Sequence, residues 1–183
     1  MNRISLVLIV LLLLQTGCLH NQQNSDHSKK SLITDQNKSL KEWNQIEIEQ
    51  ASGEHGKLFL GMTFNELYSL DLYNSDFQIT STVELDDGKT AIWTPVLLML
   101  FNTDGILYRI TVNGEISTPI GIKNGDSVDL LENHLGKSDT TYKSESSRVE
   151  EYNLRDSYFY ADISEETIIL WSISNNKYDN QSD

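Results

Sequence analysis

The segment 125–137, with the sequence GDSVDLLENHLGK, is the most clearly bounded helix in the chain. Asp126 or Ser127 supplies the side-chain oxygen of an N-cap, and Gly136 is placed to end the helix in a left-handed conformation. Between these ends, apolar residues recur at the spacing of one helix face. They are Val128, Leu131 and Leu135. The segment therefore predicts a short amphipathic helix.

A second short helix is predicted some sixty residues earlier, where residues 61–67 read GMTFNEL. Thr63 and Glu66 have the spacing of a capping box, in which each residue satisfies a backbone N–H of the other. The helix is expected to run from Thr63 to about Leu70. The two helix starts lie about 62–64 residues apart, which suggests an internal repeat.

Each helix is followed by segments with the composition and turn signals of β-strands. After the first helix they are Phe77 to Leu85, Lys89 to Trp93, Val96 to Phe101 and Ile106 to Val112, with Asp87-Gly88 as a hairpin signal. After the second helix they are Thr140 to Tyr142, Arg148 to Leu154, Ser157 to Asp162 and Thr167 to Ile173. We therefore expect an α+β fold, in which a short helix followed by antiparallel β-hairpins occurs twice and forms one mainly antiparallel sheet with helices on one face.

The helix boundaries resemble those in the repeats of β-lactamase-inhibitor-protein-like domains and of the small lipoprotein of the outer-membrane barrel-assembly machinery. The matching residues are Gly61-Met62-Thr63 with Glu66-Leu67, and Gly125-Asp126-Ser127-Val128 with Leu135-Gly136-Lys137. The resemblance covers about residues 56–174. The first half departs from it, because Leu70-Asp71-Leu72 stands in place of the closing Leu-Gly. The resemblance implies a non-enzymatic module that binds other proteins through a face of its sheet.

The N-terminus has the layout of a secretory signal. A basic start at Arg3 precedes an apolar run from Leu6 to Leu14, which is too short to span a bilayer as a helix. The end of this segment, Gly17 followed by Cys18, resembles a bacterial lipoprotein signal, although Gln15 stands where that family usually has Leu. The resemblance implies that Cys18 becomes the lipidated N-terminus. It then carries an anchor with at least two fatty acyl chains, for example palmitate. We therefore expect a membrane-anchored protein that faces outside the cytoplasm.

Composition then divides the rest of the chain. Residues 1–17 are the predicted signal peptide, and residues 18–45 are polar enough to be a flexible, lipidated tether. The folded α+β domain is predicted over 46–174, with repeat one at about 56–114 and repeat two at about 119–174. Residues 175–183 are predicted to be a disordered tail.

The net charge of −13 limits the partners of the protein. An acidic surface repels phosphate backbones, so nucleic acid is not an expected partner. It attracts a protein or peptide with a basic surface instead, although solubility alone also explains such a charge. Cys18 is the only cysteine. Once it is lipidated, no thiol remains for a disulfide, a thiolate metal site or a cysteine nucleophile.

The sequence contains no recognisable arrangement of catalytic residues. The four histidines are scattered, and no pair has the helical spacing of a zinc site. Acidic doublets occur at Asp86-Asp87, Glu150-Glu151 and Glu165-Glu166. Neighbours on a strand point to opposite faces of a sheet, so such a doublet cannot by itself form a glycosidase pair. We therefore expect no enzyme activity, no cofactor and no metal.

Tyrosines on the predicted strands are the best candidates for binding a partner. Tyr158 and Tyr160 are two residues apart and share a face, and Tyr152 and Tyr108 lie on other strands. Tyrosines exposed on a rigid sheet are typical anchors for a protein partner, but packing in the core is an equally good interpretation of Tyr158 and Tyr160. For Trp171, which is flanked by Ile169 and Ile173 on the same face of its strand, the core is favoured. On the strand 106–112, alternation puts Leu107, Arg109 and Thr111 on the same face. It leaves open which face of this strand is exposed.

The function predicted from the sequence is that of a membrane-anchored extracytoplasmic lipoprotein, a protein-binding module at the cell envelope that acts as an inhibitor or in assembly. Two alternatives remain open at this stage. One is an immunity or resistance lipoprotein that captures a toxic peptide, for which the acidic surface is the support. The other is a cell-wall hydrolase, which would need clustered carboxylates in a cleft.

Overall fold

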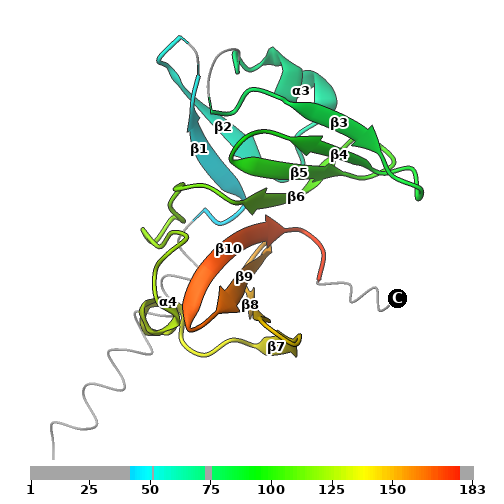
Figure 1. Ribbon diagram of the computed structural model, residues 1–183. Helices are drawn as coiled ribbons and strands as arrows, with labels where there is room; N and C mark the ends of the chain where they lie inside the picture. The colour runs from blue at the N-terminus through cyan, green and yellow to red at the C-terminus, as the bar shows by residue number, and fades with distance from the viewer. Residues whose placement is uncertain (1–41, 51, 73–75, 178–183) are drawn as a thin grey trace, which may run out of the picture.

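The computed structural model describes residues 42–50, 52–72 and 76–177 (Figure 1). The predicted signal peptide, Cys18 and most of the predicted tether lie outside these residues. Within the described part, no helix has the length and apolar character that crossing a membrane requires.

The main element is an eight-stranded sheet in which every neighbouring pair of strands is antiparallel, in the order β3-β4-β5-β6-β10-β9-β8-β7 (Figure 1). Strands β6 and β10 meet in the middle of the sheet. With two short helices beside it, the sheet makes an α+β fold, as predicted. The strands are β3 (Ser81–Glu84), β4 (Thr90–Trp93), β5 (Leu97–Phe101), β6 (Leu107–Val112), β7 (Thr140–Lys143), β8 (Arg148–Asn153), β9 (Tyr158–Ser164) and β10 (Thr167–Ser174).

Both predicted helices are present and begin where their caps predict. Helix α3 (Phe64–Ser69) has a complete capping box: the Thr63 N–H donates to Glu66 Oε2 at 2.7 Å, and the Glu66 N–H donates to Thr63 Oγ1 at 3.3 Å. The Thr63 N–H and the Thr63 hydroxyl both donate to the Glu66 carboxylate, which lowers the pKa of that carboxyl. Helix α4 (Val128–Leu135) is capped by Ser127 and ends at Gly136, which has a φ of 78°.

A two-stranded hairpin precedes the sheet and was not predicted. It consists of β1 (Gln45–Glu49) and β2 (His55–Phe59). The hairpin spans the predicted boundary between the tether and repeat one, so ordered structure begins before the expected start at 46. Trp43, which falls near the end of the predicted tether 18–45, is buried against Phe159 with a ring-centroid distance of 5.2 Å.

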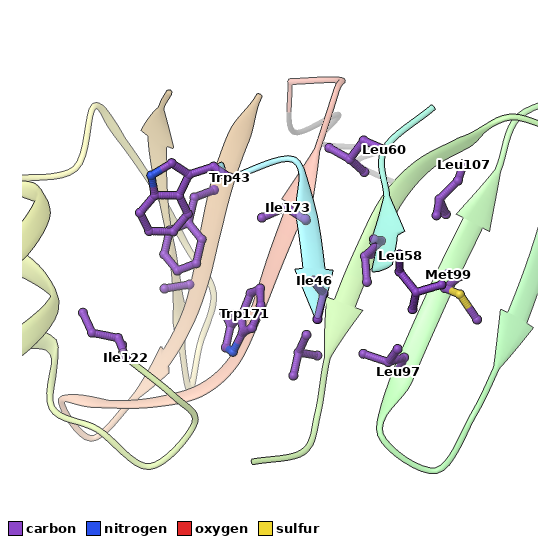
Figure 2. Close-up of a cluster of buried hydrophobic side chains, with 14 of the residues drawn as sticks. Trp43, Ile46, Leu58, Leu60, Leu97, Met99, Leu107, Ile122, Trp171 and Ile173 are labelled. Carbon is purple, nitrogen blue, oxygen red and sulfur yellow. The ribbon is translucent and has the colours of Figure 1, made fainter. Parts of the chain in front are cut away.

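The core lies on one face of the eight-stranded sheet, which we call the core face. Hairpin β1–β2 covers the middle of this face: Ile46 and Leu58 lie between Trp171 of β10 and Met99 of β5 (Figure 2). Buried residues of both helices belong to the same hydrophobic cluster. Helix α3 also stacks Phe64 on Phe101 of β5 at 4.4 Å between ring centroids. The hairpin and both helices therefore cover the same face.

Two β-bulges change the expected faces of individual residues. In β6, Leu100 pairs with Arg109 and Phe101 pairs with Leu107, so Tyr108 is an extra residue in the strand. The prediction that Leu107 shares a face with Arg109 is therefore wrong: Leu107 is buried in the core, and Arg109 points to the other face. In β10, the register shifts between Ile168 and Leu170, which leaves Ile169 half exposed, whereas Trp171 is buried as predicted.

Candidate functional site on the open face of the sheet

The second face of the sheet, which we call the open face, carries the side chains that alternate with the core residues. The helices and hairpin β1–β2 lie on the core face, so they leave this side uncovered. Residues from seven strands contribute to it, and the strand registers place them together. They include Trp93, Leu98, Leu100, Arg109, Thr111, Tyr142, Glu151, Tyr158, Tyr160, Asp162, Ser172 and Ser174.

Small polar side chains form the middle of the open face. The Thr111 and Ser172 hydroxyls are 3.1 Å apart across the β6–β10 pair, and the Ser174 hydroxyl donates to the Tyr108 carbonyl at 3.0 Å. Larger side chains, such as Leu100 and Tyr160, lie on the strands to either side of these small polar residues. Next to it lies a half-open pocket of about 370 Å³ whose lining includes Leu100 and Arg109. The middle of the open face is therefore hollowed rather than flat.

Tyr158 and Tyr160 share one face of the sheet, as their spacing predicted, and the structure shows that it is the open face. Their rings stack with a centroid distance of 6.4 Å. Tyr158 is half-buried, whereas Tyr160 is almost fully buried and donates its hydroxyl to the Asn176 carbonyl at 2.8 Å. The Arg109 guanidinium lies 5.2 Å from the centre of the Tyr160 ring. Burial, followed by the charge of Glu151, raises the pKa of Tyr160.

The other two candidate tyrosines lie in different surroundings. Tyr108, the bulge residue of β6, lines the pocket on the open face, with the Lys89 ammonium 6.0 Å from its ring centre. Tyr152 is fully buried on the core face, where it packs against Phe159 and donates to Glu150 at 2.9 Å. Tyr152 therefore belongs to the core and not to a surface that a partner can reach.

The doublet Glu150-Glu151 points to opposite faces of the sheet, as expected for neighbours on a strand. Glu151 lies on the open face with no exposed surface. Its Oε2 accepts a hydrogen bond from the Tyr142 hydroxyl at 3.1 Å, whereas its Oε1 has no hydrogen-bond partner. The nearest cation among the described residues is the Lys177 ammonium, 4.0 Å from Oε1. A buried carboxylate oxygen without a donor is unfavourable, which makes Glu151 the most unusual group on this face.

Asp162 adds a second carboxylate to the open face. Burial raises its pKa, and the positive charge of Arg109 opposes this shift. Tyr158 and Tyr160 thus lie in a mixed environment of acidic, basic and aromatic groups, which the strand order brings together from separate parts of the chain.

The segment that follows β10 also lies against the open face. Asn175 donates its N–H to the Tyr108 carbonyl at 3.0 Å, and Asn176 donates its N–H to Ser174 Oγ at 3.0 Å. Residues 175–177, which were predicted to begin a disordered tail, therefore have defined contacts. The rest of the predicted tail lies outside the described residues.

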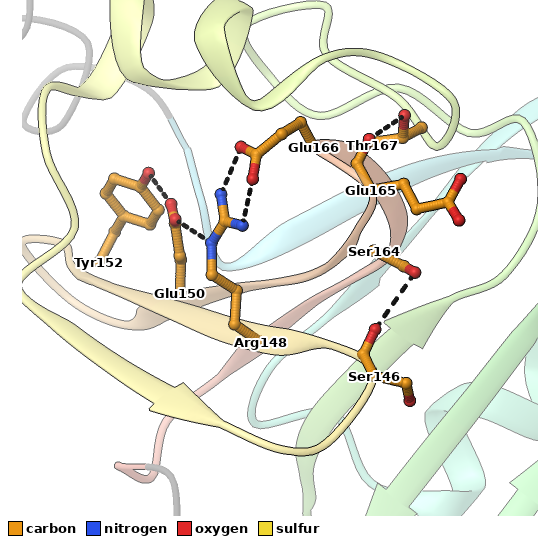
Figure 3. Close-up of polar contacts among 8 residues, drawn as sticks. All are labelled: Ser146, Arg148, Glu150, Tyr152, Ser164, Glu165, Glu166 and Thr167. Carbon is orange, nitrogen blue, oxygen red and sulfur yellow. Dashed lines mark hydrogen bonds and ion pairs between the residues drawn. The ribbon is translucent and has the colours of Figure 1, made fainter.

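Glu150, on the core face, has both carboxylate oxygens bonded (Figure 3). Its Oε1 accepts from Arg148 Nε at 3.0 Å, and its Oε2 accepts from Tyr152. The Arg148 guanidinium also makes two hydrogen bonds to Glu166, at 2.7 and 2.8 Å, in the turn between β9 and β10. These bonds lower the pKa of Glu166. This network links β8 to the turn and has a structural role.

In the part of the chain that the structure describes, the doublet Glu150-Glu151 does not bring two carboxylates together. Glu150 and Glu151 are separated by the sheet, and Asp87 pairs with Lys89 at 2.6 Å in the β3–β4 turn. Among the described residues, no cluster of three or more His, Cys, Asp or Glu side chains could hold a metal ion.

Comparison with known proteins identifies a structural likeness without a family assignment. No family model matches the chain, and no curated protein matches it. A solved structure of a DUF4309 family protein (YjgB) from Bacillus subtilis subsp. subtilis str. 168 is similar over 62% of this chain and 78% of its own, with a TM-score of 0.43 and 11% sequence identity.

Proposed function

We propose that the protein is an extracytoplasmic lipoprotein, anchored to the cell membrane through Cys18, that binds a protein partner with a basic surface on the open face of its sheet. The observation that carries this proposal is the open face itself. It is the face that the helices and hairpin β1–β2 leave open, and it combines stacked tyrosines, a hollow and a buried carboxylate with an unsatisfied oxygen. Aromatic anchors around desolvated polar groups are typical of protein-binding surfaces.

The proposed partner is basic because the chain is acidic. A net charge of −13 attracts a positively charged surface and steers its approach. Anchoring through Cys18 would confine the domain near the membrane and raise its effective concentration for a partner in the envelope. An inhibitory role and an assembly role are both compatible with this arrangement.

The proposal includes an internal repeat, in which each half is a helix followed by four antiparallel strands. The element order α3-β3-β4-β5-β6 and then α4-β7-β8-β9-β10 supports it. So do two matching bridges: the N-cap Thr63 pairs with Ile106 just before β6, and the N-cap Ser127 pairs with Thr167 at the start of β10. On this proposal, the open face is built from both halves around the central strand pair.

Replacing Cys18 by Ala should release the protein from the membrane fraction of the cells that make it, since the acylated sulfur would be lost. The measurement is fractionation of detergent-free extracts followed by immunoblotting. The control is Ser25→Ala, which changes a residue of the predicted tether and leaves Cys18 intact. This variant should stay in the membrane fraction. A Cys18→Ala protein that remains fully membrane-bound would refute the anchor.

Crosslinking in intact cells tests the binding face. A photoreactive phenylalanine analogue at Tyr158 should form a specific adduct with an envelope or secreted protein, because Tyr158 is aromatic and half-buried on the open face. The matched control places the same analogue at Tyr68, an exposed tyrosine on helix α3. Adducts of equal yield and identity from both positions, or none from position 158, would contradict binding on this face.

A further inference from the structure

We infer that Glu151 is the receptor for a lysine or arginine side chain of the partner protein, and that Lys177 occupies this position in the free protein. The inference rests on the proposed function, because it assigns the chemistry of the partner at one place on the open face. The partner's cation would approach Glu151 Oε1 and replace the ammonium of Lys177.

The contrast between Glu151 and its neighbour is the first argument. On the core face, Glu150 has a donor for each oxygen, Arg148 for one and Tyr152 for the other. On the open face, Glu151 has a donor for Oε2 only, although it has no exposed surface. A buried carboxylate gains most from a cationic donor, because charge-assisted hydrogen bonds are stronger than neutral ones. Glu151 therefore lacks the one contact that a cation would supply.

Lys177 shows that a cation can reach this carboxylate, but it does not satisfy it. Its ammonium lies 4.0 Å from Oε1, beyond hydrogen-bond distance, and 63% of its side chain is exposed. The segment that carries it is joined to the face by hydrogen bonds from the Asn175 N–H, from the Asn176 N–H and to the Asn176 carbonyl, all of them made before Lys177. An exchange of Lys177 for a better-placed cation would keep the charge of Glu151 balanced throughout.

The surroundings of Glu151 suit the long stem of a lysine or arginine. Tyr142 and Tyr160 flank the carboxylate on neighbouring strands, and the Tyr142 hydroxyl already orients it. Arg109 lies 5.2 Å from the centre of the Tyr160 ring, so a ring on this face already accepts a guanidinium. The neighbouring Asp162 adds negative charge to the same half of the face. These features favour a cationic side chain over an apolar or anionic one.

The test is a titration of the purified lipid-free domain with an oligo-lysine peptide, followed by the tyrosine ring resonances in NMR spectra. We expect saturable binding that shifts the rings of Tyr142 and Tyr160. Glu151→Gln keeps the shape of the side chain and should weaken binding at least about tenfold. Lys177→Gln removes the internal cation and should strengthen binding severalfold.

The matched control is Glu47→Gln, which makes the same change in net charge at an exposed position on hairpin β1–β2, which packs on the core face. It should bind the peptide as the unmodified domain does. An oligo-lysine peptide with acetylated side chains should not bind. Equal affinities for Glu151→Gln and Glu47→Gln, in variants that melt at the same temperature, would overturn the inference.

This outcome is separate from that of the proposed function. If the crosslinker at position 158 captures a partner but Glu151→Gln leaves peptide affinity unchanged, the open face binds a protein and Glu151 is not its cation receptor. If no adduct forms at position 158, the proposed function fails whatever the peptide does. The effect of Lys177→Gln distinguishes a receptor from a structural carboxylate, because a structural ion pair would yield no gain in binding.

Discussion

Replacing Trp171 by Ala is expected to lower the free energy of unfolding by about 3–5 kcal/mol, the range for removing a large aromatic side chain from a core. Trp171 is 1% exposed and lies on β10, in the central strand pair. Its ring packs against Phe159 at 6.0 Å between centroids, and its Nε1–H donates to the Ile116 carbonyl at 3.1 Å. The substitution would leave a cavity and an unsatisfied carbonyl under hairpin β1–β2. Urea denaturation followed by circular dichroism measures the loss.

The matched control for Trp171 is Ile169→Ala on the same strand. Ile169 is 52% exposed because it lies at the bulge in β10. Its replacement should change the free energy of unfolding by no more than about 0.5 kcal/mol. Similar losses for the two variants would mean that the bulge is misplaced and that Ile169 packs in the core.

Replacing Arg148 by Ala is expected to cost about 3 kcal/mol, the lower end of the range for leaving a buried charge without its partner. The side chain of Glu150 is 6% exposed and would keep only its bond from Tyr152. Glu165 and Glu166 both have positive φ, of 50° and 59°, so the turn between β9 and β10 is strained. The paired hydrogen bonds from Arg148 to Glu166 hold that turn, and they would be lost as well.

A double-mutant cycle tests the cause of this loss. In a Glu150→Gln background, Arg148→Ala should cost clearly less, because a neutral amide needs no cation. Arg155→Ala removes an arginine whose side chain is 73% exposed and should have little effect. Equal losses from Arg148→Ala with and without Glu150→Gln would show that the ion pair with Glu150 is not the source of the stability.

The pH dependence of stability gives an independent measure of the bond between Arg148 and Glu166. Arg148 lowers the pKa of Glu166 in the folded state, so the unfolded state binds more protons than the folded state in that range. This contribution is therefore present above the ordinary pKa of a glutamate and is lost as the pH falls through the lowered value. Arg148→Ala should flatten this part of the stability profile. An unchanged slope would contradict the assignment.

Much of the secondary structure could be predicted because its signals are local. The capping box of Thr63 and Glu66, the N-cap Ser127 and the turn at Asp87-Gly88 each depend on residues a few positions apart. Such contacts form in the same way whatever the rest of the chain does. The helix starts and the strands of the sheet therefore lie close to their predicted positions.

The candidate site was predicted less well, because its geometry is not local. Spacing placed Tyr158 and Tyr160 on one face but left the identity of that face open. The bulge at Tyr108 puts Leu107 and Arg109 on opposite faces of the sheet. Nothing in the alternation of the strand signals this inserted residue. The lack of a donor on Glu151 depends on Tyr142 and Lys177, which belong to another strand and to the end of the domain.

The order of residues by itself determined the caps, the hairpin turns, the acidic charge and the expectation of a lipidated Cys18, since each depends on composition or near neighbours. Tertiary structure alone decided which face is covered. The helices and hairpin β1–β2 cover the face that carries Trp171 and Tyr152 and leave Tyr158 and Glu151 on the other side. The physical reason is that alternation along a strand assigns residues to two faces but does not say which face is buried. Only the packing of distant apolar segments selects the set that is removed from water.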